Sequence, residues 1–247
     1  MAGTPTTAPA AKATATVPPL SPPASASATR AATKTPAASA TPAASATPTT
    51  APTLAPITDS CPLVDLKFLN DTTGYKITKT QKVAQPNSFV QCYALSADAS
   101  AGGTLSIAQG DVALTLQLGD LAAIKQRATG CNWAQLSPGT PAEIKTERTA
   151  LDALGLPASQ LLAKSIELTL KATTDKNCAG PNGAMAIPGL GETATADHNF
   201  GYEELAVAYR GALIYVVVYK TGVAPADNLP AMQKWMTSIV AQLAAKP

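Results

Sequence analysis

Large hydrophobic side chains are almost absent from residues 1–57 and recur regularly from residue 58 to the end of the chain. In the first half of this second part, apolar and polar positions alternate, which predicts half-buried strands. The strands are predicted over residues 75–83, 88–95, 104–108 and 112–118.

A helical pattern replaces the alternation in the middle of the chain. Apolar residues recur there every three or four positions over residues 121–127, 141–154 and 159–173, which predicts three helices. Thr140 is expected to cap the second helix, because Glu143 stands three positions later and completes a capping box.

A hairpin and a long helix are predicted for the end of the chain. Residues 203–209 and 212–219 are strand-like and flank Arg210-Gly211, a pair suited to a hairpin turn. Residues 230–245 place their apolar side chains on one face of a helix. Trp235 lies on that face, so we expect it in the core.

A short helix is predicted to open the folded part, capped by Asp59 or Ser60 and ended by Gly74. Residues 175–192 are predicted to form a loop. Strands first, helices in the middle, then a hairpin and a helix indicate an α+β fold with a mostly antiparallel sheet flanked by helices. Residues 216–218 are three consecutive valines, so helices should cover both faces of that sheet.

The first segment differs from the rest in composition. Residues 1–57 are almost wholly alanine, threonine, proline and serine, and they hold 11 of the 21 prolines. Proline interrupts helices, and so few large apolar side chains offer little burial to offset the entropy cost of ordering. We therefore predict a disordered low-complexity tether over residues 1–57 and one globular domain over residues 58–247.

The predicted domain is nearly neutral, with 15 lysines and arginines against all 16 acidic residues. It therefore lacks the basic surface that nucleic-acid binding requires. No segment of the chain has the apolar length of a signal-peptide core or a membrane span. We expect membrane association only through a tether whose lipid anchor lies upstream, with Met1 not the true start.

All four cysteines lie in the predicted domain, at Cys61, Cys92, Cys131 and Cys178. Zinc ligands usually include closely spaced cysteine pairs, and these cysteines are far apart, so we expect no metal and no cofactor. An even number of cysteines behind such a stalk predicts two disulfides and an extracytoplasmic location. The sequential pairing, Cys61–Cys92 and Cys131–Cys178, is predicted. Free buried thiols in a cytosolic protein are the alternative.

Two stretches carry a family resemblance over residues 59–247. The run CPLV at residues 61–64, followed by a short helix and by Cys92-Tyr93 within a strand, resembles the opening of small bacterial envelope lipoproteins of unknown function. PGLGETA at residues 188–194 is similar to a turn in their second half. Similar layouts occur in sensor-type extracellular domains of receptor kinases and in PsbP-like lipoproteins. The resemblance implies a helix-flanked antiparallel sheet, a cell-surface location and disulfides, and it supplies no catalytic residues.

Few residues suggest chemistry. The string at residues 189–194 matches the dinucleotide pattern G-x-G-x-x-A, but that fingerprint needs a strand before it and a helix after it. A loop precedes it here and a strand is expected to follow, so a tight turn is predicted. His198, the single histidine, would need a nucleophile and an orienting carboxylate, and a surface position is the simpler interpretation. Trp133, beside Cys131, is the candidate ligand contact.

These features favour a binding function without catalysis. We expect an extracytoplasmic, tethered binding or sensor domain with an apolar groove between sheet and helices, for a small apolar ligand or an envelope protein partner. One alternative is a cell-envelope scaffold or interaction module. Another is an unrecognised hydrolase that uses Asp197, His198, or Glu203 and Glu204, which converging titratable groups near His198 would favour.

Overall fold

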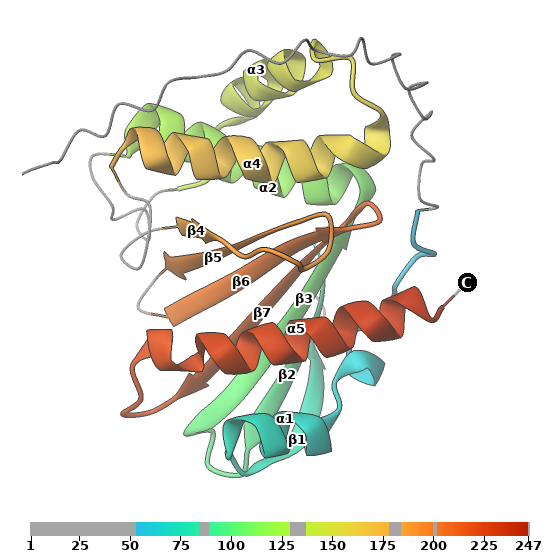
Figure 1. Cartoon of the computed structure of the whole chain (residues 1–247), viewed down its shortest axis with the longest axis vertical. Helices are drawn as coiled ribbons and strands as arrows, with labels where there is room; N and C mark the ends of the chain where they lie inside the picture. Colours follow the sequence, from blue (N-terminus) through green and yellow to red (C-terminus); the bar gives the residue numbers. More distant parts are fainter. Residues whose placement is uncertain (1–52, 84–88, 129–136, 178–183, 200–201, 247) are drawn as a thin grey trace, which may run out of the picture. The chain divides into compact units, whose positions relative to one another are not determined.

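The computed structural model describes residues 53–83, 89–128, 137–177, 184–199 and 202–246. These residues build a seven-stranded antiparallel sheet with helices on both faces (Figure 1). The α+β class and the helix-flanked antiparallel sheet predicted from the sequence are confirmed.

The elements follow one another in two groups. The first contains the short 3-10 helix η1 (Cys61–Leu63), α1 (Leu66–Thr73), β1 (Ile77–Val83), β2 (Val90–Ser96), β3 (Ala101–Gln109) and α2 (Gly110–Arg127). The second contains α3 (Pro141–Asp152), α4 (Ala158–Asp175), β4 (Ala184–Ala186), β5 (Thr193–Asn199), β6 (Tyr202–Tyr209), β7 (Ala212–Lys220), η2 (Pro225–Asn228) and α5 (Leu229–Ala244). The strands lie in the order β1-β2-β3-β7-β6-β5-β4.

Several element ends follow from local residue chemistry, as predicted. The Thr140 side chain accepts a hydrogen bond from the Glu143 N–H, and the Glu143 carboxylate accepts one from the Thr140 N–H, so a capping box opens α3. Gly74 ends α1 in the left-handed conformation, with φ 69°. Arg210 and Gly211 both have positive φ in the β6–β7 hairpin, the backbone that a two-residue turn of this kind requires.

Two predicted boundaries are wrong in the middle of the chain. Residues 112–118 form the first turns of α2 instead of a strand. Leu114, Leu118 and Leu121 are buried at helical spacing, whereas Val112 is 38% exposed, so the helical period outweighs the alternation. The loop predicted over residues 175–192 contains β4, which adds an edge strand beside β5.

The packed unit also begins earlier than predicted. Leu54 is 8% exposed, and its N–H donates to the Arg210 carbonyl at 3.1 Å. Ile57 packs against the same core, so residues 53–57 belong to the folded unit because these two side chains supply apolar surface. Residues 1–52 of the tether predicted over residues 1–57 lie outside the described residues. The helix predicted to open the folded part is two elements. Ser60 is the N-cap of η1, as predicted, and Asp65, whose carboxylate accepts the Phe68 N–H, caps α1.

Each face of the sheet has its own helical layer (Figure 1). On one face, α1 and α5 pack against the largest core cluster, and Trp235 is 1% exposed there, as predicted. A Cβ at Gly103 would lie 2.9 Å from Cζ3 of Trp235, so glycine in β3 allows α5 to approach. The other face carries α2, α3 and α4. Both faces are covered as expected, but Val217 is only half-buried on this second face.

Candidate functional site

The sheet face beneath α2 and α4 is apolar at one end. Ala108, Ala208 and Leu213 lie in neighbouring strands and are fully buried. They pack against Ala113 of α2 and Ile166 of α4 in one hydrophobic cluster. This row fixes the helical layer on the sheet.

The next two rows of the same face are mostly polar. Because side chains on one face of a sheet recur every second residue, the strand register identifies their members. The first row contains Gln91, Ser106, Tyr215, Ala206 and Thr195, and the second contains Tyr93, Thr104, Val217, Glu204 and Asp197. We call these ten residues the polar half of the sheet. All but Ser106, Ala206 and Thr195 are half-buried.

Three carboxyl groups converge at this polar half. Asp197 of β5 and Glu204 of β6 stand directly opposite each other in the antiparallel register, a position in which Cβ atoms are about 5 Å apart. The Thr195 hydroxyl donates to Oδ2 of Asp197 at 3.3 Å. Asp120 comes from α2, two turns beyond Ala113, and its charge acts on both Asp197 and Glu204. Asp120, Asp197 and Glu204 form what we call the carboxylate cluster.

Burial and mutual repulsion shift the titration of these groups. Desolvation, together with the charges of Asp120 and Glu203, raises the pKa of Asp197 to about 7, although the Thr195 hydrogen bond acts to lower it. Desolvation, then the charges of Asp197 and Asp120, raise the pKa of Glu204 to about 8. Desolvation also raises the pKa of Tyr215 well above its ordinary value.

Asp120 occupies a more open position than its two partners. Desolvation raises its pKa to about 6, yet the residue is exposed to solvent. An exposed carboxylate keeps much of its hydration, so desolvation weighs less on Asp120 than on the half-buried Asp197 and Glu204. Asp197 and Glu204 are therefore the two carboxyl groups that stay protonated most strongly near neutral pH.

No cation compensates the cluster within the described part of the chain. The lysines and arginines there that form ion pairs do so with other acids. Like charges placed directly opposite on neighbouring strands destabilise a sheet. The arrangement of Asp197 and Glu204 is thus costly to the fold, and strongly perturbed carboxyls in such places are typical of functional sites.

The sequence-predicted site residues are only partly brought together. Asp197 and Glu204 meet as described, but Glu203 is 2% exposed on the opposite sheet face, under α5. His198 lies on β5, and its side chain lies outside what the structure describes, as does the whole of Trp133. The GLGETA string forms the turn between β4 and β5, with Gly189 and Gly191 at positive φ, so the predicted turn is confirmed.

Sequence reasoning missed Asp120 and Tyr215. Asp120 continues the sheet-facing line of α2 that includes Ala113 and Gln117, so the helical period contained a signal for it once residues 112–118 were assigned to a helix. Tyr215 lies in an otherwise apolar strand. The residues beside it on the sheet are set by strand register, which the sequence does not show.

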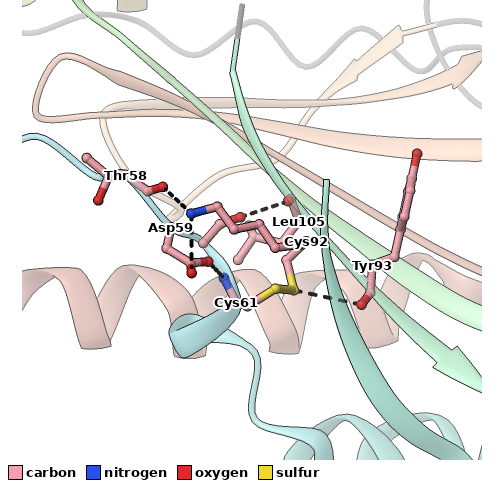
Figure 2. Close-up of a disulfide and its surroundings, with 8 residues drawn as sticks. Thr58, Asp59, Cys61, Cys92, Tyr93 and Leu105 are labelled. Carbon is pink, nitrogen blue, oxygen red and sulfur yellow. Dashed lines mark hydrogen bonds and ion pairs between the residues drawn. A yellow bond between two sulfur atoms is a disulfide. The ribbon is translucent and has the colours of Figure 1, made fainter. Parts of the chain in front are cut away.

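One predicted disulfide is confirmed. Cys61 and Cys92 are joined, with Cα atoms 5.0 Å apart, and the bond links the start of η1 to the middle of β2 (Figure 2). Cys92 is fully buried, and Tyr93 points to the opposite face of the strand. The predicted pairing of Cys131 with Cys178 lies outside the described residues.

Other site types find no support in the described segments. These segments contain no group of three histidine, cysteine or acidic residues arranged to hold a metal ion. No helix among them has the length and apolarity needed to cross a membrane. Buried apolar clusters lie on both faces of the sheet within these segments.

Comparison of the chain with protein-family models, with curated proteins and with solved structures gave no match.

Proposed function

We propose that this protein is a tethered extracytoplasmic binding domain without catalytic activity, and that the polar half of its sheet recognises a ligand bearing a cationic group. The Cys61–Cys92 disulfide supports the extracytoplasmic location, because such bonds persist in oxidising compartments. The alanine-, threonine- and proline-rich segment before residue 53 supports the tether.

One observation carries the choice of ligand. Asp197 and Glu204 face each other half-buried, with Asp120 beside them and no cationic partner in the described segments. An entering ammonium or guanidinium group would favour the ionised carboxylates, which accept charge-assisted hydrogen bonds. Binding would then release the protons that Asp197 and Glu204 hold near neutral pH.

The rest of the polar half supports a small polar ligand better than the apolar one expected from the sequence. Gln91 donates to the Ser106 hydroxyl at 3.0 Å, and Tyr93 and Thr104 stand in the row that leads to Glu204. The hydroxyl groups of Tyr93 and Thr104 offer hydrogen bonds to the remainder of a ligand anchored at the cluster.

Isothermal titration calorimetry with Nα-acetyl-arginine amide tests the proposal, with Nα-acetyl-citrulline amide as the neutral isostere. We expect binding of the arginine derivative only, with proton release at pH 7 detected by repeating the titration in buffers of different ionisation enthalpy. Asp197→Asn and Glu204→Gln should each weaken binding at least about tenfold. Glu167→Gln, which changes an exposed carboxylate on α4, should not. Equal binding of both ligands, or no effect of Asp197→Asn, would overturn the proposal.

A hydrolase is the second candidate, and the raised pKa values favour it. A carboxyl group with a pKa of about 8 beside one of about 7 resembles a general acid and base pair poised near neutral pH. Turnover of ester, peptide or glycoside substrates that Glu204→Gln abolishes would establish this alternative and overturn the binding function.

A further inference from the structure

Residues 53–60, which we call the strap, cross one end of the sheet. The Leu54 N–H donates to the Arg210 carbonyl in the β6–β7 hairpin, and this is the strap's single main-chain hydrogen bond to a strand or hairpin among the described residues. Thr53 stands beside that hairpin, since a Cβ at Gly211 would lie 3.2 Å from its methyl group. The strap is therefore packed on the sheet without being a strand of it.

Side chains hold the rest of the strap. The Gln109 amide bridges two strap residues: Nε2 donates to the Ala55 carbonyl at 3.1 Å, and Oε1 accepts the Ile57 N–H at 2.7 Å. Lys82 of β1 donates to the Thr58 carbonyl at 2.9 Å (Figure 2). Because these contacts follow one another along the strap, a pull from its N-terminal end breaks them in turn.

A covalent bond ends this series. Cys61 follows the strap directly, and its partner Cys92 is fully buried in β2. In the sheet register Cys92 pairs with Lys82 of β1 on one side and with Leu105 of β3 on the other. A load that breaks hydrogen bonds leaves a disulfide intact, so lifting of the chain stops at Cys61, which is bonded to Cys92 in β2.

We propose that the strap is a releasable latch: tension on the segment before residue 53 lifts residues 53–60 from the sheet, and the Cys61–Cys92 disulfide stops the release before α1 and β1 unfold. The inference rests on the proposed tethering. Release withdraws Leu54 and Ile57 from the core and exposes an apolar strip near the β6–β7 hairpin. Glu204 is six residues from Arg210 along β6, about 20 Å away, so the polar half keeps its structure.

Magnetic tweezers test the latch on the full chain, with one handle at the N-terminus and the other in a tag inserted at Ala99, an exposed turn residue between β2 and β3. The oxidised protein should show a reversible low-force extension of up to about 25–30 Å, the length of eight extended residues. No further extension should occur until the sheet fails. After reduction with dithiothreitol, the extension should continue through α1 and β1.

Two variants identify the contacts. Gln109→Ala removes both bridging hydrogen bonds and should speed release about tenfold at fixed force, whereas Gln160→Ala, an exposed glutamine on α4, should change nothing. Loss of strap and sheet in one event, release that passes Cys61 in the oxidised protein, or an unchanged rate in Gln109→Ala would each overturn the latch. The calorimetric titration with Nα-acetyl-arginine amide tests the ligand proposal separately, so the two failures are distinguishable.

Discussion

Replacing Glu204 with glutamine removes one carboxyl of the cluster and leaves the strand, its register and its burial in place. In the folded protein the pKa of Glu204 is raised from 4.5 to about 8, first by desolvation and then by the charges of Asp197 and Asp120. The folded state therefore holds this proton more tightly than the unfolded chain does. Folding takes up protons, and stability falls as the pH rises from about 4.5 through about 8.

The size of the effect follows from that shift. A difference of about 3.5 pH units corresponds to about 5 kcal/mol at 1.36 kcal/mol per unit. A half-buried carboxylate keeps part of its hydration and relaxes with its neighbours, so we expect about 2 kcal/mol at pH 8.5. Glu204→Gln should match the wild type at pH 4, where the carboxyl is protonated in the folded state and mostly protonated in the unfolded chain, and should exceed its stability by that amount at pH 8.5.

Urea denaturation at intervals from pH 4 to 8.5, with the disulfide intact, measures the free energy of unfolding of both proteins. The variant should show a flatter pH dependence at an unchanged m-value. Glu167→Gln is the matched control, because Glu167 is exposed and pairs with Lys164, and its curve should run parallel to the wild type. Parallel curves for Glu204→Gln and the wild type would refute the argument that this carboxyl is protonated in the folded protein.

Three further changes test the packing. Gly103→Ala should cost about 2 kcal/mol because its Cβ would crowd Trp235, and an unchanged melting temperature would contradict that contact. Replacing Cys61 and Cys92 together with serine should cost about 2–4 kcal/mol, measured by urea denaturation, and a loss below about 1 kcal/mol would argue against a stabilising bond. Thr140→Ala should cost about 1 kcal/mol through loss of the α3 cap, and hydrogen exchange in the first turn of α3 locates the effect.

The local features of the fold were predictable from the sequence because each depends on residues close together in the chain. The capping box of Thr140 and Glu143 forms within one turn of helix, and Gly74 ends α1 through its own left-handed backbone. The two-residue turn at Arg210-Gly211 needs only its own φ angles. The Cys61–Cys92 bond was chosen among few possible pairings, and the structure confirms it.

The sheet-level features required tertiary structure. The apolar positions in residues 112–118 fit both a strand and a helix. Leu114 and Leu118 of α2 pack in one cluster with side chains of α3 and α4, and this packing favours the helix. The strap was assigned to the tether because Leu54 and Ile57 are sparse in the sequence. Both side chains are ordered because they pack against the core of the folded unit. That contact joins residues far apart in the chain, so no local sequence pattern indicates it.

The carboxylate cluster shows the same division most clearly. Asp197 and Glu204 were visible as isolated acids near His198 in the sequence, and nothing local placed them on one face. The register of β5 with β6 sets them opposite each other, and the path of α2 across that face adds Asp120. The pKa of each group depends on how far the other two are removed from water and on how near they lie. Burial and proximity are defined only when the strands and the helix are assembled. The sequence alone therefore identified Asp197 and Glu204 as candidate acids, and the tertiary structure determined their pKa values.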